Sequence, residues 1–316
     1  MSLVHHDIVI VTPVYEDLEA SGRLFKELAR ELGHRVYVVA VDDGSVRQPL
    51  TLACLQDAGI AGAVLKLRRN VGHQRAISIG LSYAAESLLP DQKVVVMDSD
   101  GEDLPSTIPA LLSQLDNPSI DVVVAQRKSR VETFRFKAFY QVYKRFFSLM
   151  TGRPISFGNF MALKPAAVKR LVSMQELPIH VAAAVLASKL RTDVCPLDRG
   201  PRYAGQSKMN FVGLALHGFK ALMVFAEDVL VRVGIFSAVI AVAAVGGSAV
   251  AIALKLLGVS TPGWFSIALG VLLLIFLQTG ALALMTLMLT GVMRSGSVVT
   301  AVAHREFIAD VIETTP

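Results

Sequence analysis

Hydrophobic residues in the first half of the chain form short runs that alternate with amphipathic stretches. The runs rich in β-branched residues, which predict buried strands, span residues 7–13, 36–41, 64–67, 94–97 and 121–127. Apolar residues recur at helical spacing over residues 18–32 and 76–87. Strands that alternate with helices in this way are typical of an α/β fold whose central sheet is mostly parallel and covered on both faces.

The second half of the chain has a different pattern. Over residues 210–232, charged side chains fall toward one side of a helical wheel and apolar side chains toward the other. This predicts an amphipathic helix, which either lies along a membrane interface or packs on the first domain. Residues 233–254 and 264–293 contain no charged side chain, and each stretch is long enough to cross a bilayer as a helix. We therefore expect two transmembrane helices.

Basic residues predict the orientation of this helical pair. Arg232, Arg294 and Arg305 lie beyond its outer ends, whereas the connecting turn carries only Lys255. Positive residues favour the cytosolic side, so we expect both ends in the cytosol and the protein in the inner membrane. No signal peptide precedes the first predicted strand, which agrees with a cytosolic first domain. The predicted divisions are a catalytic domain over 1–209, a juxtamembrane helix over 210–232, a membrane anchor over 233–294 and a cytosolic tail over 295–316.

Composition supports a membrane protein with an anionic partner. Hydrophobic residues make up 53% of the 316 residues, more than an ordinary soluble protein carries. The net charge of +5 has a local source, because residues 127–153 contain eight basic side chains and one acidic one. With membrane spans nearby, this cluster favours a lipid surface or a phosphate substrate over nucleic acid. The two cysteines have no motif spacing, so we expect neither a disulfide nor a cysteine metal site.

Polar side chains follow four of the predicted strands where each strand ends. The carboxyl ends of parallel strands lie along one rim of a sheet, where open α/β folds bind their ligands. Each loop alone also fits ordinary turn chemistry, but four such loops on one rim indicate a site. The residues concerned are Tyr15 and Glu16, Asp42 and Asp43, Arg69 and His73, and Asp98 and Asp100.

The loop after the fourth predicted strand carries the strongest chemistry. Asp98, Asp100 and Glu102 offer carboxylate oxygens, which Mg²⁺ or Mn²⁺ prefers, and such ions usually take further oxygens from a substrate's phosphates. The alternative is an acidic turn that precedes a helix near Pro105. No Gly-x-Gly-x-x-Gly follows the first strand, which argues against a dehydrogenase-type dinucleotide fold.

Four motifs in this order carry a resemblance to a known family. They are TPVYED at 12–17, VDDGS at 41–45, RNVGHQ at 69–74 and MDSD at 97–100. Together they resemble the inverting family 2 glycosyltransferases of the GT-A fold, and in particular the polyprenyl-phosphate glycosyltransferases such as dolichol-phosphate mannose synthases and bactoprenol glucosyltransferases. The resemblance covers about residues 7–294.

The resemblance implies roles for individual residues. The donor would be a UDP- or GDP-sugar, the cofactor Mg²⁺ or Mn²⁺, and the acceptor a polyprenyl phosphate, with undecaprenyl phosphate expected. It implies nucleotide-sugar binding by Pro13, Tyr15, Glu16, Asp42, Asp43, Asp98 and Ser207. It implies metal binding by Asp98, Asp100 and Glu102, catalytic roles for Asp100, Arg202 and Lys208, and binding of the acceptor phosphate by Arg127 and Arg130.

The chain also departs from the family's pattern at the place of an acceptor base. Ser156 and Asn159 stand where many relatives have acidic residues, and neither side chain can act as a base at neutral pH. A phosphate acceptor needs none, because its oxygens are already largely ionised. Glu102 stands where relatives often have Gln, which adds a negative charge to the metal loop, and Glu16-Asp17 replaces the usual Asn-Glu.

The sequence thus predicts a metal-dependent membrane glycosyltransferase, and relatives suggest a homo-oligomer. Two other hypotheses stay open. One is a glycosyltransferase that acts on a polysaccharide or a protein, although the Gln-x-x-Arg-Trp motif of processive synthases is missing. The other is a non-catalytic membrane scaffold that retains the fold.

Overall fold

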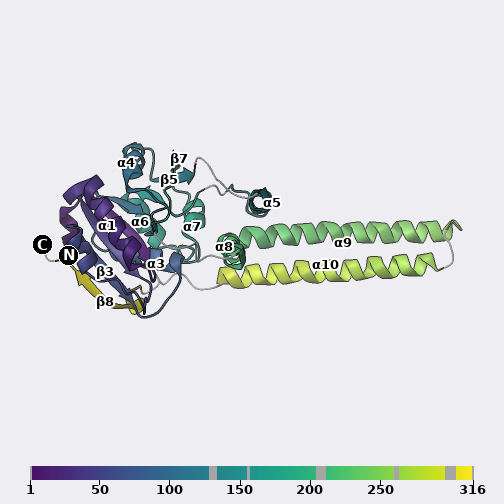
Figure 1. Ribbon diagram of the computed structural model, residues 1–316. Helices are drawn as coiled ribbons and strands as arrows, with labels where there is room; N and C mark the ends of the chain where they lie inside the picture. Colours follow the sequence, from purple (N-terminus) through teal and green to yellow (C-terminus); the bar gives the residue numbers. More distant parts are fainter. Residues whose placement is uncertain are drawn as a thin grey trace. The chain divides into compact units, whose positions relative to one another are not determined.

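The protein divides into two compact units in a computed structural model, which describes residues 2–127, 134–154, 157–203, 211–259, 263–295 and 304–314 (Figure 1). The first unit, here called the sheet unit, contains Met1–Ser148, Arg153–Val224 and Val299–Pro316. The second, the helical unit, contains Leu149–Gly152 and Phe225–Val298.

A mixed sheet forms the centre of the sheet unit. Within the described residues it has eight strands in the order β7-β5-β6-β4-β1-β2-β3-β8. Strands β4, β1, β2 and β3 are parallel to one another, β6 is antiparallel to both β4 and β5, and β8 is antiparallel to β3. The strands are β1 (Ile8–Val14), β2 (Val36–Asp42), β3 (Ala61–Leu67), β4 (Lys93–Val96), β5 (Val122–Arg127), β6 (Met161–Leu163), β7 (Thr192–Leu197) and β8 (Ile308–Glu313).

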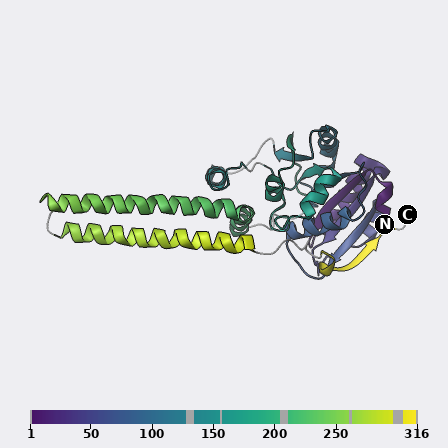
Figure 2. The same ribbon diagram turned by 180° about the vertical axis from the view of Figure 1, so that it is seen from behind.

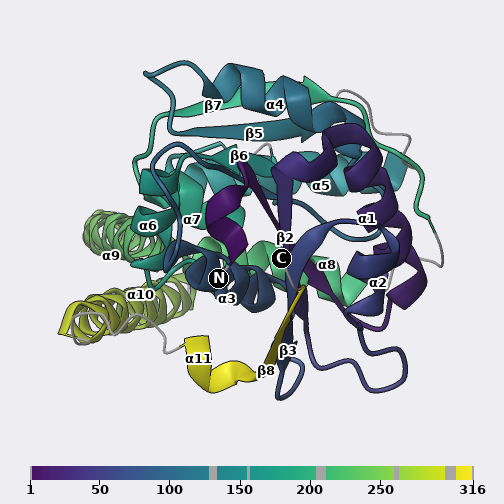
Figure 3. The ribbon, with the colours of Figure 1, turned by 90° about the vertical axis from the view of Figure 1, so that its left-hand side faces the viewer.

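Helices cover both faces of this sheet (Figure 3). The side chains of β1 alternate between the two faces: Val9 and Val11 belong to the core beneath α3, α6 and α7, while Ile8 and Ile10 belong to the core beneath α1, α2 and α4. The helices of the sheet unit are α1 (Leu18–Leu32), α2 (Ala53–Asp57), α3 (His73–Ala85), α4 (Ile108–Leu115), α6 (Pro165–Val172), α7 (Val181–Ala187), α8 (Phe211–Met223) and α11 (His304–Phe307), and α5 (Phe134–Thr151) continues into the helical unit.

The α/β class with a mostly parallel central sheet is confirmed. Every residue of β1 and of β2 is buried, which explains why these strands read as continuous apolar runs. Helix α1 has the predicted bounds and buries Leu24, Phe25 and Leu28 on one face. Helix α3 packs so closely on β1 and β2 that a Cβ added at Gly80 would lie 2.6 Å from a methyl carbon of Val11.

Several elements differ from those expected. Strand β3 begins at Ala61 rather than at residue 64, and α3 begins at His73 rather than at residue 76. The stretch over 210–232, expected as one helix, is divided between α8 and α9 (Ala226–Leu256), because Phe225 adopts a non-helical backbone conformation. Strands β6, β7 and β8 were not expected, since each is short or lacks a run of apolar residues.

The helical unit consists mainly of α9 and α10 (Trp264–Ser295), which run side by side (Figures 1 and 2). Both are long and apolar enough to cross a membrane. In the most apolar window of α9 only 17% of residues are buried, and in that of α10 none is. The core helix of a soluble protein would hide such side chains, so this exposure is compatible with contact to lipid.

The last described residues return to the sheet unit. They fall within the stretch expected as a tail, yet β8 lies along the edge of the sheet beside β3 (Figure 2). The backbone N–H of Arg68 donates to the carbonyl oxygen of Phe307 at 2.9 Å, and the hydroxyl of Tyr83 donates to Glu313 at 2.6 Å. Arg305 forms two hydrogen bonds with Glu86, at 3.0 and 2.6 Å. Residues that follow the apolar helices in the sequence therefore complete the same sheet.

Deleting residues 304–316 should destabilise the sheet unit. The deletion exposes the edge of β3 and removes the partners of Arg68, Tyr83 and Glu86. We expect the midpoint of thermal unfolding in detergent to fall by at least about 5 °C. The Glu306→Gln variant, which changes an exposed side chain of the same segment, should unfold like the wild type. Equal midpoints for the deletion and the wild type would contradict the structural role of β8.

Candidate active site

Four loops meet at the carboxyl ends of the parallel strands. The backbone N–H of Asp43 donates to the carbonyl oxygen of Val14 at 2.8 Å, which joins the loops after β1 and β2. The hydroxyl of Ser99 donates to the carbonyl oxygen of Pro13 at 3.0 Å, which joins the loop after β4 to the last residues of β1. The loops after β2 and β4 thus both contact the carboxyl end of β1.

Asp43 links the loop after β2 to the loop after β3. Its carboxylate accepts hydrogen bonds from the backbone N–H groups of Val71 and Gly72, at 2.7 and 3.0 Å. Burial raises the pKa of this carboxyl group, although the two hydrogen bonds oppose the shift. The loops approach so closely that a Cβ added at Gly44 would lie 2.5 Å from the carbonyl carbon of Arg69, so only glycine fits there. Asp43 therefore sets the start of α3.

Two further acids organise the loop over 44–50. Asp42 accepts hydrogen bonds from the backbone N–H groups of Ser45 and Leu50, at 3.1 and 2.9 Å. Glu16 accepts from three successive N–H groups, those of Val46, Arg47 and Gln48, at 2.9, 3.1 and 2.8 Å. These hydrogen bonds lower the pKa of Glu16. Both carboxylates fix the backbone beside the rim, and their nucleotide-binding role stays a prediction.

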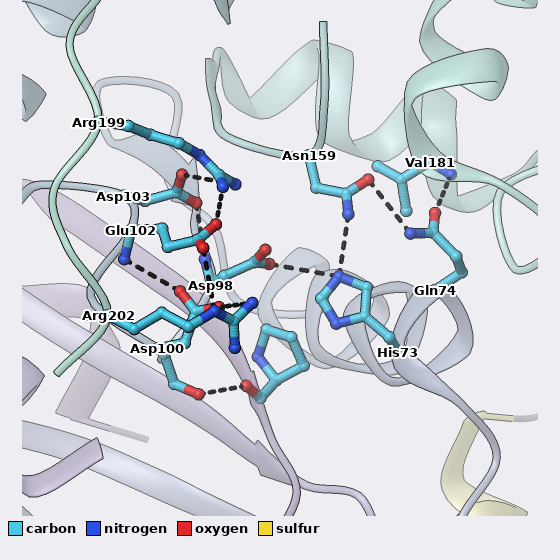
Figure 4. Close-up of polar contacts among 12 residues, drawn as sticks. His73, Gln74, Asp98, Asp100, Glu102, Asp103, Asn159, Val181, Arg199 and Arg202 are labelled. Carbon is cyan, nitrogen blue, oxygen red and sulfur yellow. Dashed lines mark hydrogen bonds and ion pairs between the residues drawn. The ribbon is translucent and has the colours of Figure 1, made fainter. Parts of the chain in front are cut away.

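The acidic loop after β4 folds back on its own carboxylates (Figure 4). Asp103 accepts a hydrogen bond from the backbone N–H of Asp98 at 3.0 Å, and Asp100 accepts one from the N–H of Glu102 at 3.0 Å. Gly101 between them has a φ of 88°, a left-handed conformation that glycine adopts without strain. This turn brings four carboxylates together.

Two arginines face these carboxylates. Arg202 lies 2.8 Å from Asp100 and donates to Glu102 at 3.0 Å, and Arg199 forms ion pairs with Glu102 and with Asp103 (Figure 4). Burial and the neighbouring charge of Asp98 raise the pKa of Asp100, and the arginines offset only part of this shift. The site therefore pairs concentrated negative charge with guanidinium groups, as a site for a charged ligand requires.

On the other side of Asp98, a chain of polar contacts runs through His73 (Figure 4). The backbone N–H of Val181 donates to Gln74 at 2.6 Å, and the Gln74 side chain donates to Asn159 at 3.3 Å. The Asn159 amide nitrogen lies 2.9 Å from Nε2 of His73, which is 3.3 Å from Oδ1 of Asp98. The sequence predicted His73 on the rim. It did not indicate that His73 links Asp98 to Asn159, which stands where many relatives have an acidic residue.

Asp98 and His73 shift each other's pKa. Burial alone would lower the pKa of His73, but the Asp98 carboxylate outweighs it and the pKa is raised. Burial alone would raise the pKa of Asp98, but His73 outweighs it and the pKa is lowered. Both groups are thereby favoured in their charged forms.

The donor set at this loop fits a divalent cation. Oδ1 of Asp98 is buried and accepts no hydrogen bond of regular geometry from the described residues. Carboxylate oxygens are what Mg²⁺ and Mn²⁺ prefer. In the described part of the chain, no three His, Cys, Asp or Glu side chains are placed to hold a metal by themselves. A cation at Asp98 and Asp100 would therefore need oxygens from a ligand, and phosphates supply them.

The remaining predicted site residues cannot all be placed. Arg127 ends β5, and nothing is described of its side chain. Pro13 lies in β1, and Tyr15 follows that strand with an exposed ring. Arg130, Ser156, Ser207 and Lys208 lie outside the described residues.

A pair of histidines next to this network, of which His180 is buried, was not expected. His180 accepts a hydrogen bond from the backbone N–H of Ala183 at 3.2 Å and so caps the start of α7. Its ring packs on that of His217 from α8, with centroids 4.3 Å apart. Burial, with a contribution from His217, lowers the pKa of His180 to about 3. The only hint in the sequence is a histidine just before an alanine-rich helical stretch.

Comparison with known proteins assigns the family. The model of glycosyl transferase family 2 matches residues 9–171, and the chain belongs to this family. It is similar to the dodecaprenyl-phosphate galacturonate synthase of Rhizobium johnstonii, with 29% identity over 129 residues that cover 39% of this chain and 37% of that protein. It is also similar to the glycosyltransferase YkcC of Bacillus subtilis, with 25% identity over 212 residues that cover 65% of this chain and 64% of that protein. The chain thus spans less than two thirds of the length of either relative.

Solved structures agree on the fold, which is GT-A. A crystal structure of glucosyl-3-phosphoglycerate synthase from Mycobacterium tuberculosis, in complex with Mn²⁺, UDP-glucose and phosphoglyceric acid, matches with a TM-score of 0.52. Its sequence is 15% identical, and the match covers 71% of this chain and 80% of that one. A second crystal structure of the same enzyme, with Mn²⁺ and UDP-glucose, also gives a TM-score of 0.52 at 14% identity, covering 71% and 79%.

The low pKa of His180 predicts loss of stability in mild acid. The unfolded histidine titrates near pH 6.5, whereas the folded one titrates near 3, so between these values the unfolded state binds more protons. Stability should therefore fall as the pH drops below about 6.5, by up to about 1.4 kcal/mol per pH unit. Thermal unfolding in detergent at pH 7.5 and 5.5 would show this.

The matched variants for this test are His180→Asn and His34→Asn. Asparagine can still accept the hydrogen bond from Ala183 but carries no proton. The His180→Asn variant should lose less stability than the wild type on acidification, while His34→Asn, at an exposed position, should behave like the wild type. An equal loss in the wild type and His180→Asn would show that His180 is not the titrating group.

Proposed function

We propose that this glycosyltransferase moves a sugar from a nucleotide-sugar donor to a polyprenyl phosphate, and that undecaprenyl phosphate is its acceptor. The single observation that carries the proposal is the acidic loop with Asp98 and Asp100, paired with Arg202 at the rim of a family 2 fold. The attached pair of exposed apolar helices supports an acceptor that lies in a membrane.

The donor binds at the rim as a UDP- or GDP-sugar. The nucleoside would bind at the ends of β1 and β2, near Pro13, Tyr15, Glu16, Asp42 and Asp43. Asp98 and Asp100 would hold Mg²⁺ or Mn²⁺, which would neutralise charge on the diphosphate. The Mycobacterium tuberculosis enzyme of the same fold was crystallised with Mn²⁺ and UDP-glucose, which supports this choice of ligands.

The acceptor is chosen on three grounds. The similar Rhizobium protein is named a dodecaprenyl-phosphate galacturonate synthase, and dodecaprenyl phosphate is a polyprenyl phosphate. Arg127 and Arg130 stand where the family resemblance puts contacts to the lipid phosphate, and arginine suits phosphate because its planar fork can donate two parallel hydrogen bonds. Asn159 is neutral and hydrogen-bonded to its neighbours, which suits an acceptor that needs no base.

The reaction is a single displacement. An oxygen of the lipid phosphate attacks the anomeric carbon, while the bond from that carbon to the donor's β-phosphate oxygen breaks. The nucleoside diphosphate leaves with the electron pair, and the configuration at the anomeric carbon inverts. Arg202, beside Asp100, and Lys208 offset the charge that develops on the departing diphosphate.

Connectivity supports a membrane hairpin. The chain leaves the sheet unit at Val224 and re-enters it by Val299, so both ends of the apolar pair connect to one folded unit. Two helices that cross a bilayer in succession bring the chain back to its starting side. The arginines at the outer ends support a cytosolic location for that side, and we infer that the membrane is the inner membrane. The proposed divisions remain 1–209, 210–232, 233–294 and 295–316, except that 210–232 is divided between α8 and α9 and the last stretch contributes β8 to the sheet. A homo-oligomer is proposed from the family resemblance alone.

A transfer assay on the purified protein in detergent tests this proposal. It would combine undecaprenyl phosphate, Mn²⁺ or Mg²⁺ and a panel of radiolabelled UDP- and GDP-sugars, with the lipid extracted and counted. We expect label in the lipid with one donor, none with a chelator, and a loss on the order of 100-fold or more in Asp100→Asn. Asp57→Asn, at an exposed position on α2, is the matched control and should keep full activity.

Other outcomes would overturn parts of the proposal. A donor that binds but never labels the lipid would contradict the lipid acceptor and favour a polysaccharide or protein acceptor. A chain that binds no donor at all would be a scaffold rather than an enzyme.

A further inference from the structure

The segment over 199–203 is bound tightly against the acidic loop. The backbone N–H of Gly200 donates to the carbonyl oxygen of Glu102 at 3.1 Å, and that of Tyr203 donates to the carbonyl oxygen of Asp100 at 2.9 Å. The Tyr203 ring lies against Gly101, where an added Cβ would approach it to 2.5 Å. This segment leads directly to residues 204–208, which contain the predicted Ser207 and Lys208.

Glu102 is the centre of the contacts between the two segments (Figure 4). One carboxylate oxygen accepts from Nε of Arg202 at 3.0 Å, and the other is paired with Arg199. The three side chains are 21 to 29% exposed, so water weakens these ion pairs less than on an open surface. Both oxygens of Glu102 are therefore engaged by guanidinium groups.

The arginines would be poorly compensated without Glu102. Among the described residues, Arg199 would keep one other ion pair, with Asp103 at 4.0 Å, and Arg202 would keep its ion pair with Asp100. Burial already lowers the pKa of Arg199, which shows that its charged form is held against a desolvation cost. A metal ion that took an oxygen of Glu102 would have to displace one of these guanidinium groups.

The far end of the segment has a second attachment. The Tyr203 hydroxyl donates to Glu27 of α1 at 2.5 Å, and the guanidinium of Arg23 lies over the Tyr203 ring at 4.4 Å. The segment is thus fixed to the body of the sheet unit at Tyr203, and to the acidic loop through Arg199 and Arg202.

We propose that Glu102 is a positioning residue: it holds Arg199 and Arg202, and with them the segment over 199–203, against the loop that binds the donor diphosphate. It does so in place of the metal-ligand role expected from its position in the motif. The identity of the ligand at this loop rests on the proposed function. The attachment of the segment over 199–203 to the loop does not depend on it. Relatives with glutamine here would lack this double ion pair, because a neutral amide cannot compensate two cations.

Hydrogen exchange in the full-length protein tests the anchor without substrate or metal. Glu102→Gln and Arg199→Gln should each speed exchange of the amides of Gly200 and Tyr203 by about tenfold. The double variant should add little to Glu102→Gln, because that variant already removes the ion pair with Arg199. Glu19→Gln, at an exposed position on α1, is the control and should leave the exchange unchanged. Unchanged exchange in both single variants would overturn the proposal.

A second measurement separates the anchor from a metal ligand. Mn²⁺ binding in the presence of UDP, followed by electron paramagnetic resonance, would be compared in Glu102→Gln and Glu102→Ala. The two variants carry the same charge, but only glutamine offers an oxygen to the metal. The anchor role predicts Mn²⁺ dissociation constants that agree within about threefold, whereas a ligand role predicts binding at least about tenfold weaker in the alanine variant.

Failure of the proposed function would be distinguishable from failure of this inference. A wild type that transfers no sugar to the lipid refutes the acceptor assignment, while the exchange and Mn²⁺ results still decide the role of Glu102.

Discussion

The site depends on one electrostatic constraint, which is the compensation of four carboxylates placed within six residues after β4. Asp98, Asp100, Glu102 and Asp103 would repel one another strongly in a half-buried loop without cations nearby. Arg199 and Arg202 supply two of these cations and His73 a third. The arrangement leaves the loop ordered, and it leaves Asp98 with a buried oxygen that accepts no regular hydrogen bond from the described residues. A divalent cation with a diphosphate would complete this balance of charge.

The rim that presents this loop is built by backbone hydrogen bonds to other acids. Asp43 fixes the start of α3, and Asp42 and Glu16 fix the loop over 44–50, in each case by accepting from N–H groups that have no partner within a strand or helix. These acids therefore stabilise the loops of the rim even if they also contact a nucleotide. Their substitution would disturb the position of His73 and the shape of the loop as well as any ligand contact.

Much of this architecture could be predicted from the sequence, because its signals are local. The strands β1, β2 and β4 are continuous apolar runs, α1 has regular helical spacing, and the polar strand ends follow at once. The elements that escaped prediction depend on distant pairing. Strand β8 pairs with β3, although the whole helical unit separates the two in the sequence. Strand β6 has only three residues, which pair with β4 and β5.

The site residues also divide into those with a local sequence signal and those that depend on distant pairing. Asp98 and Asp100 were found from a motif, while the ion pairs of Glu102 with Arg199 and Arg202 join residues about a hundred positions apart. Nothing in the sequence near Glu102 indicates that its charge is already paired. The stack of His180 on His217 likewise joins two separate helices, so no local pattern could reveal it.

The proposed function requires that the rim bind a nucleoside diphosphate through a divalent cation held by Asp98 and Asp100. The most direct test is a calorimetric titration of UDP and of GDP into the purified protein, with and without Mn²⁺, alongside Asp98→Asn. We predict binding of one nucleotide that requires Mn²⁺ and is weakened at least about tenfold in the variant. Binding that is equally tight without metal, and unchanged in Asp98→Asn, would contradict the account.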